Sequence, residues 1–284
     1  MKLCRFQNAA QQIRIGLVPD GDNLLDLTSV GVGQLFPLLE AEDIPARLAA
    51  LARQNPPRLA WSEVQLLAPT EAQEIWAAGV TYLRSKKARM EESDFSATAY
   101  DRVYEAERPE IFFKALAQKV VGPNGAVGIR EDSKWNVPEP ELALVLNSRG
   151  QVVGYTIGND MSSRDIEGAN LLYLPQAKIY ERSCALGPFV TIATEAEARS
   201  WQIRIQIVRH DEIVFSGETA VSQIKRAFSG LAEFLFRSQR FPGGAILLTG
   251  TGIVPQDDFS LQPGDRIRIE ITGIGTLTNS VVVV

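Results

Sequence analysis

Short apolar runs separated by turn-forming residues fill the chain from residue 111 onward. Runs of roughly four to eight residues that are rich in valine, isoleucine and phenylalanine are typical of β-strands. One amphipathic helix interrupts them, because Ile224, Phe228, Leu231 and Leu235 recur on one helical face. The predicted strands are residues 111–113, 142–147, 152–158, 189–192, 203–208, 246–248, 267–271 and 280–284.

The first part of the chain has a different pattern. Two predicted strands, residues 14–18 and 24–27, flank a turn, and two short helices are predicted at residues 32–39 and 44–53, the second ending before a Pro-Pro stop signal. We therefore expect a small N-terminal α/β domain, residues 1–65, and a larger domain, residues 66–284. Few strands alternate with helices in the larger domain. The expected class is α+β and β-rich, with a mixed β-roll or barrel-like domain and no doubly wound sheet.

Between these parts, residues 75–80 form a further predicted strand. Residues 81–108 are charged and have helical spacing but few apolar positions. Such a segment is either a lid beside a site or a pair of surface helices, and the sequence leaves both open.

Composition narrows the classes of function. Of 284 residues, 45% are hydrophobic and 22% are charged, which is typical of a globular protein. The net charge of −5 and the lack of a dense basic block argue against binding to nucleic acid or to an anionic membrane. No apolar run approaches the ~20 residues that cross a bilayer. Two cysteines cannot form a disulfide framework, and a cytoplasmic location is expected.

The chain has one histidine, His210, which lies in a predicted turn between two apolar runs. A histidine-rich metal site is thereby excluded. Acid–base chemistry must fall to carboxylates, lysine, tyrosine or bound water.

Carboxylates gather around one predicted hairpin. Glu139 and Glu141 lie two residues apart, so on an extended chain they face the same side, and they lead into an apolar run that should be buried. Residues 147–150, Asn-Ser-Arg-Gly, are residue types typical of a β-hairpin turn. If Asn147 pairs with Gln151, Asp160 lies beside Glu139, and if the register slips by one residue, Asp160 faces Glu139 directly. Either register brings three carboxylates within roughly 5–8 Å.

Three acidic groups without histidine or cysteine are typical of a site for a hard cation. Mg²⁺ is expected, with Mn²⁺ or Ca²⁺ as further candidates. The alternative is an acidic loop end that pairs with Arg164, Lys134 or Arg149.

Several ordered motifs in this part of the chain resemble the fumarylacetoacetate hydrolase superfamily. They are E-x-E-L-A from Glu139, G-Y-T-x-x-N-D-x-S-x-R-D from Gly154, L-G-P from Leu186, T-G-T-G from Thr249 and G-I-G-T-L-x-N from Gly273. The resemblance covers roughly residues 75–284. It implies a C-terminal mixed β-roll, a homodimer, and Mg²⁺ or Mn²⁺ held by Glu139, Glu141 and Asp160. The larger domain is then the metal-binding catalytic domain.

The sequence departs from the hydrolytic members of this family at one position. Those members carry G-x-N-Y-x-x-H, and the corresponding segment, residues 79–85, has Ser85 where the histidine would stand. The stretches RPEIFFKA and DIEGANLLYLPQAKIYERSCALGP are most similar to the 2-keto-3-deoxy-D-arabinonate dehydratase branch. The resemblance therefore implies dehydration of a 2-oxo-3-deoxy sugar acid to 2,5-dioxopentanoate through a metal-stabilised enolate.

The resemblance also implies roles for single residues. Lys178 corresponds to a lysine at the metal site and is the candidate for moving the C3 proton or for stabilising the enolate oxygen. Apart from the resemblance, Glu110 and Glu92 are weaker candidates for the acid that protonates the leaving hydroxyl, and the sequence around each favours a solvated surface glutamate.

Four residues are candidates for binding the small 2-oxo acid substrate. Arg164 organises either the metal carboxylates or the substrate carboxylate, unless it forms a plain salt bridge. Thr251 can offer its hydroxyl and backbone N–H groups, or it belongs to a glycine-bounded turn. Lys114 and Ser85 complete the set.

The leading hypothesis is thus a metal-dependent hydro-lyase. The alternatives are an acylpyruvate or fumarylacetoacetate-type C–C hydrolase, an oxaloacetate decarboxylase or tautomerase of the same superfamily, and a binding protein without activity.

Overall fold

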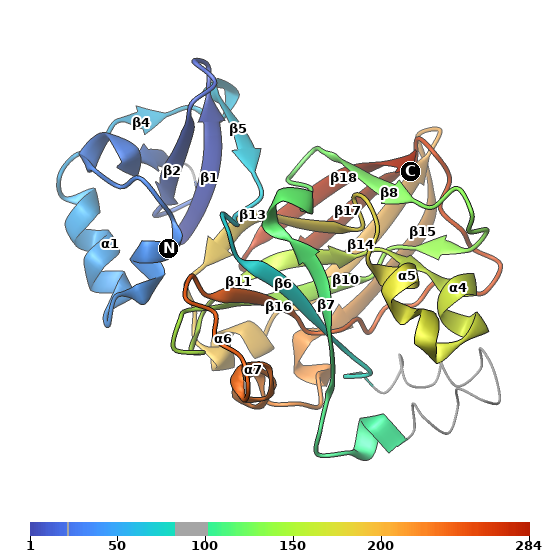
Figure 1. Cartoon of the computed structure of the whole chain (residues 1–284). Helices are drawn as coiled ribbons and strands as arrows, with labels where there is room; N and C mark the ends of the chain where they lie inside the picture. Colours follow the sequence, from blue (N-terminus) through green and yellow to red (C-terminus); the bar gives the residue numbers. More distant parts are fainter. Residues whose placement is uncertain (22, 83–101) are drawn as a thin grey trace.

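The computed structural model describes residues 1–21, 23–82 and 102–284, and strands dominate it (Figure 1). The predicted α+β, β-rich class is confirmed. The strands are β1 Lys2–Asn8, β2 Ile13–Val18, β3 Leu24–Asp26, β4 Arg58–Leu59, β5 Val64–Leu67, β6 Glu74–Gly79, β7 Glu110–Leu116, β8 Ala126–Ile129, β9 Asn136–Val137, β10 Pro140–Leu146, β11 Val152–Asp160, β12 Ser162–Ser163, β13 Cys184–Thr191, β14 Gln202–Arg209, β15 Glu212–Ala220, β16 Ala245–Leu248, β17 Arg266–Ile271 and β18 Gly275–Val283.

The helices within the described ranges are short. The α-helices are α1 Ile44–Ala52, α4 Arg164–Ala169, α5 Leu174–Lys178, α6 Glu195–Arg199 and α7 Phe228–Phe236. The 3-10 helices are η1 Leu27–Val30, η2 Phe36–Glu40, η3 Trp61–Glu63, η4 Ala117–Lys119, η5 Leu171–Tyr173 and η6 Val221–Gln223. None of the described helices has both the length and the apolarity that spanning a membrane requires.

Two sheets form the body of the molecule. The larger has the order β4-β3-β2-β1-β13-β11-β10-β16-β6-β7, with β5 paired to β1, and the smaller has the order β15-β14-β17-β18-β8. The N-terminal strands extend the larger sheet, because β1 pairs with β13 at Lys2 and Leu3. In Figure 1 these strands form a lobe beside the main body. The domain boundary near residue 65 stays a prediction.

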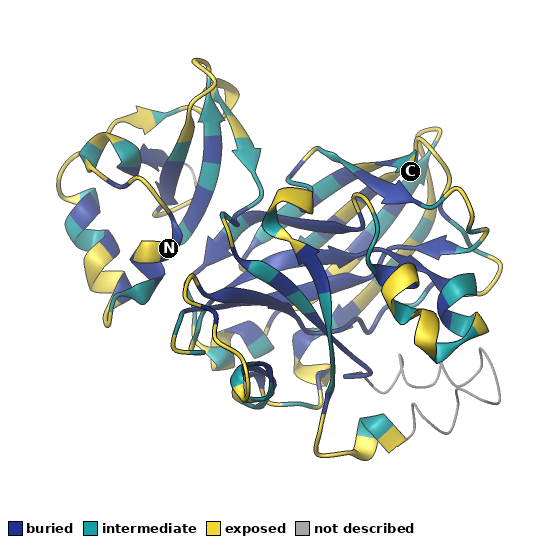
Figure 2. Ribbon diagram, viewed as in Figure 1, coloured by how far each residue is buried: buried dark blue, intermediate teal, exposed yellow. Residues whose placement is uncertain are grey.

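The central strand β10 is buried on both faces (Figure 2). Leu142 and Leu144 pack into the core that the larger sheet shares with β14 and β17 of the smaller sheet. Ala143 and Val145, on the opposite face, pack in a second core with residues of the N-terminal lobe such as Leu48. The uninterrupted apolar run predicted this double burial.

Most of the predicted elements occur with bounds shifted by a few residues. The strands predicted after residue 111 are confirmed. The predicted amphipathic helix is confirmed as α7, which begins at Phe228, so Ile224 lies before the helix. The turn at His210 is also confirmed, because both His210 and Asp211 have positive φ between β14 and β15. The helix predicted at residues 32–39 is wrong, because only the 3-10 helix η2 forms there. The sequence missed β1, β8, β15 and the helices α4 to α6, whose five or six residues are too few to show a helical period.

Candidate metal and active site

The β10–β11 hairpin contains both of the predicted registers. At the turn, the Asn147 N–H donates to the Gln151 carbonyl at 3.1 Å. A bulge between Val145 and Leu146 then shifts the pairing by one residue. At the mouth of the hairpin, the Asp160 N–H donates to the Glu139 carbonyl at 3.0 Å, so these two residues face each other directly.

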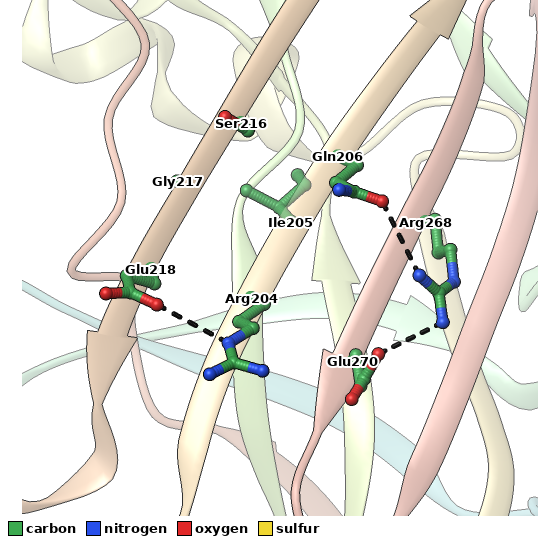
Figure 3. A pocket seen from close by; sticks show the side chains of 8 residues that line it. All are labelled: Arg204, Ile205, Gln206, Ser216, Gly217, Glu218, Arg268 and Glu270. Atoms are coloured by element: carbon green, nitrogen blue, oxygen red, sulfur yellow. Dashed lines mark hydrogen bonds and ion pairs between the residues drawn. The ribbon is translucent and has the colours of Figure 1, made fainter. Parts of the chain in front are cut away.

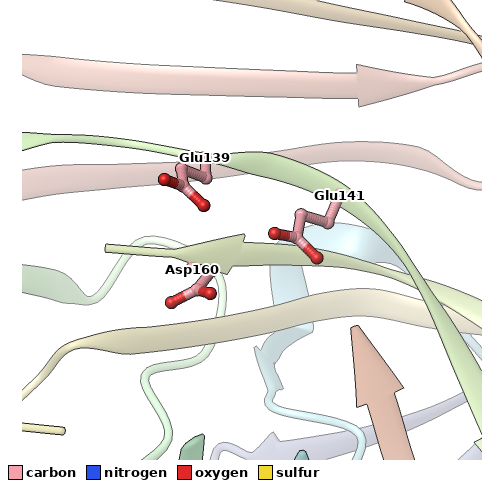
Figure 4. A group of neighbouring side chains, drawn as sticks. All are labelled: Glu139, Glu141 and Asp160. Atoms are coloured by element: carbon pink, nitrogen blue, oxygen red, sulfur yellow. The ribbon is translucent and has the colours of Figure 1, made fainter. Parts of the chain in front are cut away.

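This register brings the three predicted metal ligands together (Figure 4). Carboxylate oxygens of Glu139, Glu141 and Asp160 all lie within 4.8 Å of one another. The three residues are 3%, 1% and 1% exposed, so water screens their charges poorly. Like charges at this distance in a buried place require positive charge beside them.

Three cationic side chains supply part of that charge. Lys178 Nζ lies 2.8 Å from Glu139 Oε2 and 3.4 Å from Asp160 Oδ2. Arg164 Nη2 lies 3.2 Å from Glu139 Oε1, and Lys114 pairs with Asp160. All three cations are buried.

Glu141 is the carboxylate of the triad that forms no ion pair with Lys178, Arg164 or Lys114. Its Oε2 accepts the Gly250 N–H at 2.6 Å, and no ion pair to it occurs among residues 1–21, 23–82 and 102–284. Burial raises the pKa of Glu141 well above its ordinary value, and the neighbouring Asp160 and Glu139 charges raise it further. A divalent cation among the three carboxylates would neutralise this charge, and an all-oxygen ligand set fits Mg²⁺, Mn²⁺ or Ca²⁺.

A fourth acidic residue, Glu110, lies on the same face of the larger sheet. A Cβ on Gly79 would overlap Glu110 Oε2, so the Glu110 side chain lies over Gly79. In β6, Ile75 and Ala77 pack in the same core as Ala143 of β10, and side chains alternate along a strand. Gly79 therefore faces the side on which the carboxylates of Glu139 and Glu141 lie.

The other predicted site residues have various positions. The Lys114 ammonium donates to the Met161 carbonyl at 3.0 Å and to the Lys178 carbonyl, and it also pairs with Asp160. An ammonium group has three donors, so Lys114 holds the site together and has no N–H left for a substrate. The Thr251 hydroxyl accepts the Ile253 N–H at 3.1 Å within a turn. Ser85 and Glu92 lie outside the described residues.

A cavity of about 440 Å³ adjoins Glu110, which is a suitable size for a small ligand. One wall is formed by Glu167, Leu171 and Leu174, from α4, η5 and the start of α5, the helix that ends at Lys178. Residues just before Glu110, including Val103 and Pro109, also line the cavity. The sequence did not indicate Glu167, whose buried carboxylate accepts a hydrogen bond from Ser162 Oγ at 2.8 Å.

A second hollow lies on the outer face of the smaller sheet (Figure 3). Its charges satisfy one another, because Arg204 pairs with Glu218 at 3.4 Å and Arg268 pairs with Glu270 at 3.0 Å. All four side chains are at least about a third exposed. The carboxylate cluster, with its buried and unbalanced charge, is therefore the stronger candidate for a functional site.

Comparison with known proteins agrees with this assignment. Residues 74–282 match the family described as "Fumarylacetoacetate (FAA) hydrolase C-terminal". The chain is 45% identical over 253 residues to a probable 2-keto-3-deoxyxylonate dehydratase of Haloferax volcanii, covering 84% of this chain and 87% of that one. It is 40% identical over 224 residues to 2-dehydro-3-deoxy-D-arabinonate dehydratase of Saccharolobus solfataricus, covering 78% and 75%.

A solved structure shares the fold over the whole chain. It is a 2-keto-3-deoxy-D-arabinonate dehydratase complexed with magnesium and 2,5-dioxopentanoate, with 33% identity, a TM-score of 0.83, and coverage of 100% of this chain and 99% of that one. The resemblance that the sequence motifs indicated is confirmed. The chain belongs to the fumarylacetoacetate hydrolase family.

Proposed function

We propose that this protein is a metal-dependent hydro-lyase that dehydrates a 2-keto-3-deoxy sugar acid, such as 2-keto-3-deoxy-D-arabinonate, to 2,5-dioxopentanoate. The observation that carries the proposal is the buried triad of Glu139, Glu141 and Asp160 with Lys178 between two of its members. The names of the relatives at 45% and 40% identity support the same reaction.

A divalent cation, Mg²⁺ first among the candidates, would be held by the triad and would act as a Lewis acid toward the carboxylate and C2 carbonyl of the substrate. Lys178 takes the C3 proton in this proposal. Lys178 pairs with Glu139 and Asp160, and a cation held by these carboxylates would take over that pairing and leave the Lys178 amine for the substrate. Lys114 donates to the Lys178 carbonyl and so fixes the end of α5 in place.

Glu110 serves as the acid that protonates the leaving C4 hydroxyl, which departs as water. Its side chain lies over Gly79 on the face of the triad and at the wall of the cavity. Loss of water leaves a double bond between C3 and C4. Glu110, ionised after donating its proton, then takes a proton from C5 while Lys178 returns its proton to C3, which gives an enol with a double bond between C4 and C5. Transfer of the C5 hydroxyl proton to C4 converts this enol to the aldehyde of the product.

The remaining predicted residues have supporting roles. Arg164 holds Glu139 in its ligand position, at 3.2 Å. Thr251, next to the Gly250 N–H that contacts Glu141, binds the substrate carboxylate. Ser85 occupies the position of the hydrolytic histidine, which favours dehydration over C–C hydrolysis, and Glu92 is the second candidate for the acid.

The test is turnover by the purified protein with Mg²⁺. Incubation with 2-keto-3-deoxy-pentonates should release a dioxo acid, detected by mass spectrometry, and EDTA should stop the reaction. Glu141→Gln is the matched inactive control, because it removes one ligand charge and keeps the shape of the side chain. Cleavage of acylpyruvates or conversion of oxaloacetate, with the sugar acids untouched, would overturn the proposal.

We further propose that the protein is a cytoplasmic homodimer. The family resemblance supports the dimer, and two free, buried cysteines are consistent with a reducing compartment. Light scattering on the purified protein measures its mass, and a monomer would contradict the first part. Fractionation of cells that express the protein tests its compartment.

A further inference from the structure

The dipeptide Lys225-Arg226 lies between η6 and α7, and it contacts the chain on both sides of the connection from β6 to β7. The Lys225 N–H donates to the Thr81 carbonyl at 3.1 Å, two residues after the end of β6. The Lys225 ammonium donates to the Tyr104 carbonyl at 2.9 Å and lies 4.1 Å from the centre of the Tyr104 ring.

The Arg226 guanidinium binds three backbone carbonyls just before β7. It donates to the Glu107 carbonyl at 3.0 Å, to the Val103 carbonyl at 3.0 Å and to the Ala106 carbonyl at 2.9 Å. These carbonyls follow or belong to the helical turn at residues 102–105. The last carbonyls of a helical turn lack backbone partners and attract cations, so a guanidinium with five donors suits them well.

The chain that Arg226 binds carries parts of the active site. Val103, Ala106 and Pro109 line the cavity, and Glu110 begins β7 three residues after Glu107. Proline fixes its own φ, so the short link from Glu107 to Glu110 has little freedom to compensate for movement. The position of the Glu110 carboxylate therefore depends on these three hydrogen bonds.

Arg226 is itself firmly supported. Arg199 of α6 donates to the Ile224 carbonyl at 3.1 Å and to the Arg226 carbonyl at 2.9 Å. The Arg199 guanidinium lies 4.5 Å from the centre of the Phe228 ring and pairs with Glu195 at 2.8 Å. The backbone that carries Arg226 is thus anchored to α6 and α7.

We propose that Arg226 is a positioning residue, which holds residues 103–109 so that Glu110 and the cavity wall are placed for the substrate. It touches neither the triad nor Lys178, and it acts only through the backbone that it binds. This inference rests on the proposed function for its kinetic readout, and on amide exchange for a readout that is independent of activity.

The test compares Arg226→Met and Arg226→Lys with the matched control Arg268→Met, an exposed arginine on the outer face of the smaller sheet. Arg226→Met should lower kcat/KM by about 10- to 100-fold, as expected for a misplaced catalytic group. Arg226→Lys should recover part of the loss, because one ammonium can bond some of the carbonyls. The rise in Tm on adding Mg²⁺ should not change, since the triad is intact.

Hydrogen exchange provides the second readout. In Arg226→Met, the amides of residues 103–108 and of Glu110 should exchange faster while those of β10 and β11 keep their rates. Unchanged kcat/KM with unchanged exchange would overturn the proposal, and so would an acceleration spread evenly over the chain. If the wild-type protein dehydrates no sugar acid, the proposed function fails, yet the exchange comparison still decides whether Arg226 positions this segment.

Discussion

Replacement of Glu141 by glutamine should stabilise the metal-free protein and abolish its response to Mg²⁺. Oxygens of Glu141, Glu139 and Asp160 lie within 4.8 Å of one another. At an effective dielectric constant of ~20, each of its two neighbours repels the Glu141 charge by about 3 kcal/mol, and Lys178 offsets part of the sum. The wild-type protein can escape this repulsion by protonating Glu141, which costs about 3–4 kcal/mol at pH 7. Both routes give a net penalty of about 3 kcal/mol.

Glutamine removes this penalty and still accepts the Gly250 N–H. The metal-free variant should therefore melt roughly 6–12 °C above the metal-free wild type at pH 7. Saturating Mg²⁺ reverses the order. At a concentration of about 1,000 times Kd, binding stabilises the wild type by about 4.1 kcal/mol, which exceeds the penalty of about 3 kcal/mol, whereas the variant has lost one of three ligand charges and gains little.

The pH dependence has a definite sign. Since the pKa of Glu141 is raised in the folded protein, the metal-free fold loses stability as pH rises from the ordinary carboxyl pKa toward the raised one. Glutamine does not titrate, so the advantage of the variant should disappear in acid, where Glu141 is protonated in both states.

Thermal melts by circular dichroism, with and without Mg²⁺ and from pH 4 to pH 8, measure all of these effects. Glu218→Gln, an exposed substitution on the outer sheet face, is the control and should shift neither curve. Two results would refute the reasoning: a metal-free Glu141→Gln protein that melts below the wild type, or an equal response of both proteins to Mg²⁺.

Three further predictions concern single side chains. Lys178→Met should lower kcat by about 10²- to 10⁴-fold while Mg²⁺ still raises the Tm, and a lost Mg²⁺ response would assign Lys178 to metal binding instead. Gly79→Ala places a Cβ against Glu110 Oε2, so it should lower kcat about as much as Glu110→Gln, with no further loss in the double variant. Leu144→Ala, in the fully buried strand β10, should lower the free energy of unfolding by about 2–5 kcal/mol in urea denaturation, with Mg²⁺ binding retained.

The hairpin that carries the candidate metal ligands could be predicted because its determinants are local. The two-residue spacing of Glu139 and Glu141 fixes their common face, and the turn at residues 147–150 fixes which strands pair. The final register could not be decided, because it depends on the bulge between Val145 and Leu146. A bulge forms where packing favours it, and β10 packs against both β16 and the smaller sheet, which are distant in sequence.

The cationic partners are harder to predict from local pattern. They come from three separate elements: Lys114 from β7, Arg164 from α4 and Lys178 from α5. The two helices are too short to show a helical repeat of apolar residues in the sequence. Only the family resemblance pointed to Lys178, which in isolation resembles an exposed lysine. The contacts of Arg226 could not be predicted from the sequence, because its partners are backbone carbonyls. Every residue has a backbone carbonyl, so the sequence does not show which of them an arginine binds.

Charge balance connects these residues to the proposed substrate. In the proposed reaction Lys178 is the base, so Lys114 and Arg164 are the cations that stay beside the triad. With a divalent ion, these two cations would exceed the three triad carboxylates by one positive charge, and the buried carboxylate of Glu167 at the cavity wall offsets that charge. In this proposal the transfer of the C3 proton to Lys178 leaves the total charge of the site unchanged, because negative charge develops at C2 at the same time. Each further carboxylate on the substrate would add a buried negative charge without a fixed cationic partner, which is costly, so the charge distribution favours a sugar monoacid over a dicarboxylate.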